Sequence, residues 1–202
     1  SQAPADVPDL IARCLAGDPW PAVRRIRREG LWEYVAAEGC DAHVGAILLD
    51  RLTHLGVDVP ESAIGQMRAY RDHVAAANAY KFAEVARVLA RLRMAKVSFL
   101  LLKGAALNAT VYEAGQRPMT DIDVLVRPQD VDAADRVLKN SGCRPGADLV
   151  RSDFYPRYYY EREYFTQRNP AVKIDLHCRP FCLLRYARTV PDGAMWSNCR
   201  EV

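Results

Sequence analysis

The sequence predicts an α+β fold in which a helical first half precedes a core built on a small sheet. From residue 1 to about residue 95, apolar side chains recur at helical spacing. From Val97 onward the pattern changes to short apolar or alternating runs of the kind found in strands. These runs are Val97–Leu102, Asp121–Val126, Arg157–Gln167 and Ala171–Cys178. We therefore expect a helical region packed on a sheet-containing core.

Length and composition indicate a globular protein with room for one or two domains. The chain has 202 residues, of which 50% are hydrophobic and 26% are charged. No apolar stretch approaches the roughly 18–20 residues of a membrane span. A basic segment followed by an apolar one is not seen at the N-terminus, so we expect a cytoplasmic protein without a secretory signal. The net charge of +3 is too small to indicate nucleic-acid binding by itself.

Turn and capping residues divide the first half into helices. A short helix should end near Gly17-Asp-Pro19 and a second should begin near Pro21. Helical spacing then covers Leu31 to Leu55, with a break near Gly39-Cys-Asp41 and Gly56 as C-cap. A long helix is predicted from Glu61 to about Ala95. It should pack across the sheet; its irregular heptad argues against coiled-coil dimerisation, and the oligomeric state stays open.

The second half alternates strands and helices. A helix over Ala105–Glu113 should end at Gly115, and another should begin at Pro128 and close at Ser141-Gly142. Arg168-Asn-Pro170 should turn the last two strands into a hairpin. The segment beyond Pro180 has no clear partner, which suggests a chain cut from a longer protein. We expect a helical region at 1–95, a core at 96–180 and a C-terminal extension at 181–202.

Two alternating carboxylates open one of the predicted strands. Asp121 and Asp123 are separated by one residue, so in a strand they project from the same face. Adjacent carboxylates repel each other, and a divalent cation such as Mg²⁺, which prefers oxygen ligands, would remove that repulsion. This pair follows a strand that ends in Lys103-Gly104, a residue pair suited to holding phosphate at a helix N-terminus. The segment therefore indicates a metal site for phosphate chemistry.

Three motifs in order resemble those of the DNA polymerase β-like nucleotidyltransferase superfamily, and most closely its uncharacterised nucleotidyltransferase branch. The resemblance covers roughly Asn78 to Pro180, and Ala105 stands where many members carry a hydroxyl residue. The motifs are Leu102-Lys-Gly104, then Tyr112 and Arg117-Pro-Met-Thr-Asp-Ile-Asp-Val-Leu-Val126, then Ile174-Asp-Leu-His177. The fold so implied is a polymerase β-like core with a small mixed sheet.

The resemblance implies an enzyme that moves a nucleoside monophosphate from an NTP to a hydroxyl acceptor with Mg²⁺, or Mn²⁺ in its place. Asp121 and Asp123 would hold both metals, while Asp175 would hold one and serve as the nearest general base. Phosphate contacts would come from Lys103, Gly104, Ala105, Arg117 and Thr120. His177 shares a face with Asp175 and would tune that carboxylate or touch the substrate.

Structural roles compete with several of these assignments. Arg117 could equally form a structural ion pair, Thr120 could serve a local turn, and Lys103 could be a surface lysine at a strand end. The acceptor could be a small molecule, a protein or tRNA. A toxin-like enzyme that modifies tRNA is one alternative, motivated by the basic cluster Arg24–Arg28, which could also be a solvated helix face. A non-catalytic nucleotide-binding or interaction module is the other. The six cysteines should be buried free thiols.

Overall fold

The computed structural model describes residues 4–146, 161–180, 191 and 193–199. The chain divides into two units. The first comprises Ser1–Asn78 and Tyr112–Pro118, and the second comprises Ala79–Val111 and Met119–Val202. Helices and a small mixed sheet make up the described residues, so the predicted α+β class is confirmed.

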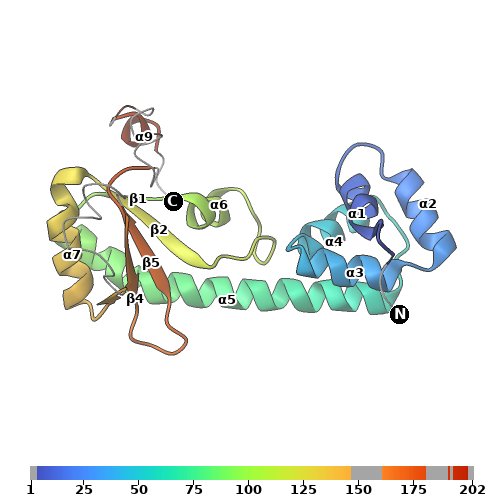
Figure 1. Cartoon of the computed structure of the whole chain (residues 1–202), viewed down its shortest axis with the longest axis horizontal. Helices are drawn as coiled ribbons and strands as arrows, with labels where there is room; N and C mark the ends of the chain where they lie inside the picture. The colour runs from blue at the N-terminus through green and yellow to red at the C-terminus, as the bar shows by residue number, and fades with distance from the viewer. Residues whose placement is uncertain (1–3, 147–160, 181–190, 192, 200–202) are drawn as a thin grey trace. The chain divides into compact units, whose positions relative to one another are not determined.

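The first unit consists of helices that bury one apolar face each. Its helices are α1 (Val7–Leu15), α2 (Trp20–Glu29), α3 (Trp32–Asp41), α4 (Gly45–His54) and the N-terminal part of α5 (Glu61–Met94) (Figure 1). Gly56 follows α4 with φ of +64°, the left-handed conformation that glycine adopts without strain, as its predicted capping role requires. The side chains buried between these helices include Leu10, Ile26, Val35, Leu48, Leu52 and Met67.

The segment Tyr112–Pro118 belongs to the first unit because polar contacts attach it there. Arg71 on α5 donates from Nε to the carbonyl oxygen of Ala114 at 3.3 Å. Gln116 donates from Nε2 to Asp50 Oδ2 at 2.7 Å. Gly115 lies so close to α5 that a Cβ atom would come within 2.3 Å of the Arg71 carbonyl oxygen. A glycine is therefore required at this point.

The second unit contains a mixed five-stranded sheet. Its strands are β1 (Phe99–Leu101), β2 (Asp121–Val126), β3 (Arg144–Pro145), β4 (Glu161–Phe165) and β5 (Lys173–His177). They lie in the order β1-β2-β5-β4-β3, and only the β2–β5 pair is parallel among them (Figure 1). The antiparallel β4–β5 pair confirms the predicted hairpin, although residues 157–160 of the expected strand fall outside the described residues.

One face of this sheet packs against helices. The helices of the unit are the C-terminal part of α5, α6 (Lys103–Thr110), the 3₁₀ turn η1 (Pro128–Asp130), α7 (Val131–Asn140) and α9 (Ala194–Ser197). Apolar residues of α5 and α7 share a core with Ile122, Val124, Ile174 and Leu176 of the central strands. The predicted limits of α6 were wrong. It begins at Lys103 rather than Ala105 and ends at Thr110, because the chain then enters the segment held by Arg71.

The cysteines and the helices of the described residues bear on two expectations from the sequence. Cysteines 14, 40, 143, 178 and 199 are free thiols, as expected, and Cys182 falls outside the described ranges. The expected burial holds for Cys14 and Cys143, whereas Cys40 and Cys178 are half-buried and Cys199 is exposed. Among the helices that the structure describes, none combines the length and apolar character needed to cross a membrane.

Candidate functional site

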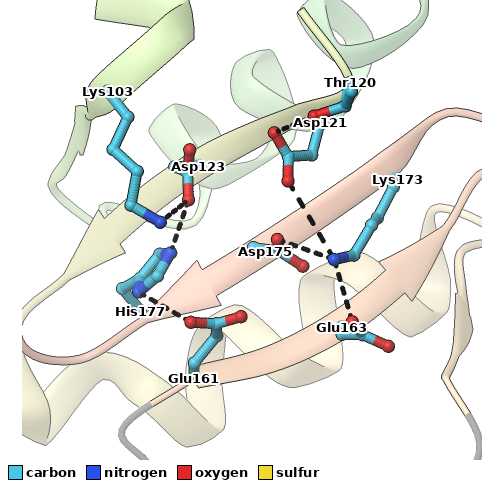
Figure 2. Close-up of polar contacts among 9 residues, drawn as sticks. All are labelled: Lys103, Thr120, Asp121, Asp123, Glu161, Glu163, Lys173, Asp175 and His177. Carbon is cyan, nitrogen blue, oxygen red and sulfur yellow. Dashed lines mark hydrogen bonds and ion pairs between the residues drawn. The ribbon is translucent and has the colours of Figure 1, made fainter. Parts of the chain in front are cut away.

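Polar side chains gather on the sheet face opposite the apolar core. Strand alternation directs Ile122 and Val124 of β2 into the core, so that Asp121 and Asp123 point the other way. The same alternation in β5 and β4 adds more polar groups to this face. The resulting acidic cluster comprises the carboxylates of Asp121, Asp123, Glu161, Glu163 and Asp175, and it is accompanied by Lys103, Lys173 and His177 (Figure 2).

Strand register brings residues from distant parts of the chain together. Asp123 of β2 pairs with Asp175 of β5, and Asp121 pairs with Lys173. On the other side of β5, Glu163 of β4 also pairs with Asp175. Cross-strand partners lie on the same face of a sheet, so β5 contributes the centre of the cluster. The three aspartates predicted from the sequence are thus neighbours on one surface (Figure 2).

Asp123 is buried and held by two donors. Only 2% of it is exposed. Lys103 Nζ lies 2.6 Å and His177 Nε2 lies 2.8 Å from its Oδ1. Burial alone would raise the pKa of this carboxyl, but the hydrogen bonds from His177 and Lys103 outweigh it and hold the pKa below its usual range. Asp123 is therefore an ionised carboxylate at neutral pH.

His177 is completely buried next to Asp123. An ionised carboxylate only accepts, so Nε2 carries the proton in this contact. Nδ1 lies 3.6 Å from Glu161 Oε2, too far for a hydrogen bond. The sequence suggested that His177 would tune Asp175 or touch substrate. The structure places its Nε2 beside Asp123 and buries the ring away from solvent.

Asp175 is almost as deeply buried as Asp123 but has a different environment. It is 3% exposed, and its Oδ2 lies 3.0 Å from Lys173 Nζ. Oδ1 is buried without a hydrogen-bond partner among the described residues. Burial raises the pKa of Asp175 to about 6, against the opposing effect of Lys173 and with added repulsion from Glu161 and Asp121. A second cation near Oδ1 would relieve this desolvation.

Lys173 is the central cation of the cluster, and the sequence reasoning missed it. Its Nζ lies 2.8 Å from Glu163 Oε1 and 4.0 Å from Asp121 Oδ2, in addition to its contact with Asp175 (Figure 2). Burial alone would lower the pKa of Lys173, but the hydrogen bonds to Glu163 and Asp175 raise it above its usual value. The alternation Lys173-Ile-Asp-Leu-His177 was the signal that could have placed this lysine beside Asp175.

The predicted phosphate-binding turn has an unusual backbone. Lys103 has φ of +45°. This left-handed conformation is unfavourable in free energy for a residue that carries a side chain. Gly104 follows it in the first turn of α6, and the buried side chain of Ala105 packs in the core. A Cβ on Gly104 would meet only Met119 Cγ, at 3.6 Å. The strained position is thus Lys103, not the glycine, and strain of this kind is often found at ligand sites.

Arg117 and Thr120 belong to different units of the chain. Arg117 lies in the first unit, where its guanidinium carbon is 5.6 Å from the centroid of the Tyr112 ring and its carbonyl accepts a hydrogen bond from Asn78 Nδ2. Thr120 lies in the second unit and donates from Oγ1 to Asp121 Oδ1 at 3.0 Å. This bond joins Thr120 to a carboxylate of the cluster, and its role in a turn or in ligand binding stays a prediction.

The chemistry of the cluster fits a hard divalent cation. The carboxylates of Asp121, Asp123, Glu163 and Asp175 lie within 4.0 Å of the ammonium groups of Lys103 and Lys173. The buried Oδ1 of Asp175 has lone pairs to spare. Among the described residues, however, no three His, Cys, Asp or Glu side chains converge closely enough to hold one metal ion. The ammonium groups of Lys103 and Lys173 contact Asp123 and Asp175 directly. The donor set is therefore suitable, and a cation would have to displace lysine contacts.

Fold and site together define an α+β protein whose small mixed sheet carries an acidic cluster beside the N-terminus of a helix, an arrangement consistent with a nucleotidyltransferase core. The chain belongs to the uncharacterised nucleotidyltransferase family, whose model matches residues 29–202. Comparison with curated proteins and with solved structures found no match.

Proposed function

We propose that the protein transfers a nucleoside monophosphate from an NTP to a hydroxyl acceptor. The observation that supports this most strongly is the register that pairs Asp123 with Asp175, with Asp121 two residues earlier on the same face. Membership of a nucleotidyltransferase family agrees with it. In this reaction the acceptor oxygen forms a bond to the α-phosphorus. The bond between the α-phosphorus and the oxygen that bridges the α- and β-phosphates breaks, and pyrophosphate leaves.

The proposed roles follow from what each side chain can reach. Asp121, Asp123 and Asp175 would hold Mg²⁺, or Mn²⁺ in its place, which when bound would neutralise charge on the attacking and leaving oxygens. Asp175 is the nearest candidate to take the proton of the acceptor hydroxyl. His177 keeps Asp123 oriented. Lys103 is the first residue of α6. Its ammonium group would bind the terminal phosphates together with the backbone amides of Gly104 and Ala105.

The proposed acceptor is a hydroxyl group, carried by a small molecule, a protein or a tRNA. The basic cluster on α2 gives little support to tRNA. Arg25 contacts Glu29 at 3.2 Å, and Arg28 contacts the same carboxylate at 2.8 Å. These pairs neutralise part of the positive charge that would attract a phosphate backbone.

Transfer of labelled nucleotide tests the proposal. The protein would be incubated with α-³²P-labelled NTPs, Mg²⁺ or Mn²⁺, and separate pools of RNA, protein and small metabolites. We expect label to appear in one pool with the wild type and to be lost in Asp121→Ala/Asp123→Ala. Asp132→Ala is a matched control, because Asp132 is an exposed aspartate of α7 and should leave transfer unchanged.

The outcomes separate the alternatives. Metal-dependent NTP binding without transfer to any pool would favour a non-catalytic nucleotide-binding module. Transfer to RNA alone would favour the tRNA-modifying enzyme. Binding of neither metal nor NTP would refute the proposed function.

A further inference from the structure

Lys173 has a position that the proposed reaction does not explain. Its ammonium group touches Glu163 and Asp175 and lies 4.0 Å from Asp121 (Figure 2). Two of these three carboxylates, Asp121 and Asp175, are proposed metal ligands. The lysine therefore occupies the space in which those two aspartates would share a cation.

The covalent geometry of β5 keeps Lys173 at this position. Lys173 and Asp175 are two residues apart in one strand, so both side chains leave the same face of the sheet as long as β5 stays paired. Lys103 differs, because it lies outside the strands at the start of α6 and its side chain is 54% exposed. Lys173 is thus a cation attached to the carboxylates that it neutralises.

The structure assigns to Lys173 the role of a tethered counter-ion that competes with a divalent cation for the carboxylates of Asp121 and Asp175. This inference rests on the proposed function in so far as it takes these two aspartates as metal ligands. Without metal, Lys173 limits the repulsion between them. A divalent cation brings twice the charge and binds several oxygens at once, so it can replace the ammonium group.

The edge of the cluster offers the displaced ammonium a new position. The side chain of Lys173 is 30% exposed, and that of its partner Glu163 is 47% exposed. Glu163 can therefore retain Lys173 near solvent while Asp121 and Asp175 turn to the metal. Lys173 is a positioning residue in this scheme, since it acts through the two aspartates.

Mn²⁺ binding to the full chain, without NTP, tests the inference. Free Mn²⁺ would be measured by electron paramagnetic resonance for the wild type, Lys173→Gln and Lys173→Arg. Removal of a charge about 4 Å from the site should raise the Mn²⁺ affinity of Lys173→Gln about tenfold, whereas Lys173→Arg should stay near the wild type. Lys139→Gln is the matched control. Lys139 contacts Asp135 at 2.9 Å on α7, outside the cluster, and its loss should not alter affinity.

Thermal unfolding gives a second readout. Without metal, Lys173→Gln should unfold at a lower temperature than the wild type, and Mn²⁺ should raise its melting temperature by more. Equal or weaker Mn²⁺ binding by Lys173→Gln would overturn the inference. So would a Lys173→Gln protein that fails to fold and is not rescued by Mn²⁺. Metal-dependent transfer with unchanged affinity in Lys173→Gln would remove this inference alone, whereas tighter Mn²⁺ binding without transfer would remove only the proposed function.

Discussion

Asp123 and Asp175 pair in register across β2 and β5 and are almost equally buried, yet their pKa values shift in opposite directions. Burial opposes ionisation of both. His177 and Lys103 overcome it at Asp123, whereas Lys173 does not overcome it at Asp175. The two substitutions to asparagine should therefore have opposite effects on stability.

Asp175→Asn should stabilise the metal-free protein at pH 7.5. Because the folded pKa of about 6 lies above the ordinary value of 3.8, the folded state binds more protons between these pH values. The stability of the wild type therefore falls as pH rises from about 4 to 6 and stays reduced above. Asparagine removes this cost, and we expect a gain of about 1–3 kcal/mol in the free energy of unfolding. Urea denaturation in EDTA across this pH range measures it. A loss of stability at pH 7.5 would contradict the reasoning.

Asp123→Asn should destabilise the protein at pH 7. The substitution removes the charge that accepts hydrogen bonds from His177 and Lys103, and a hydrogen bond to a charged group contributes about 1.5–3 kcal/mol. The folded pKa of Asp123 lies below its ordinary value of 3.8, so its contribution is complete above that pH and is lost as pH falls through the folded pKa. The difference between mutant and wild type should shrink in acid. A constant difference from pH 7 to pH 3 would show that the contacts, not the charge, matter.

Lys103→Gly should be more stable than Lys103→Ala in the absence of ligand. Both variants lose the ammonium group, but only glycine relieves the left-handed backbone at φ of +45°. We expect a difference of about 0.5–1 kcal/mol, after allowance for the greater freedom of glycine in the unfolded chain. Thermal unfolding compares the two. NTP binding should be weakened equally in both, because the lost charge is the same.

Gly115→Ala should destabilise the first unit. Its φ is +83°, and the added Cβ would lie 2.3 Å from the Arg71 carbonyl oxygen, so α5 or the segment Tyr112–Pro118 must move. The expected cost exceeds about 2 kcal/mol. Gly65→Ala is the matched control within α5, because no atom lies within 4 Å of its added Cβ. That change should stabilise the helix by roughly 0.5–1 kcal/mol. Both are measured by circular dichroism during thermal unfolding.

Features encoded by neighbouring residues were predicted well from the sequence. The long helix was expected from Glu61 to about Ala95 and runs to Met94, because apolar spacing and an N-terminal proline are local signals. Asp121 and Asp123 alternate with apolar residues, and this local pattern correctly predicted that both aspartates lie on the same face of a strand. The predicted domain limits at residues 95 and 180 stay predictions.

Features that depend on strand register were not predicted. Glu161 and Glu163 join the cluster only because β4 lies beside β5, an order that local patterns do not encode. Lys173 differs, because its alternation with Asp175 in β5 is a local signal. His177 was expected to tune Asp175 or to touch the substrate, and its contact with Asp123 across the parallel pair was not foreseen. Arg117 makes its described contacts in the first unit, and its phosphate-binding role stays a prediction.

The parallel pairing of β2 with β5 also determines when during folding the acidic cluster can form. Antiparallel β1–β2 and β4–β5 join segments that are near in sequence, whereas Asp123 and Asp175 meet only after the intervening chain has closed a long loop. Non-local contacts of this kind form slowly. Hydrogen exchange during refolding should therefore protect the β4–β5 hairpin before the amides shared by β2 and β5. Assembly of the cluster would then mark the last stage at which the second unit acquires its native topology.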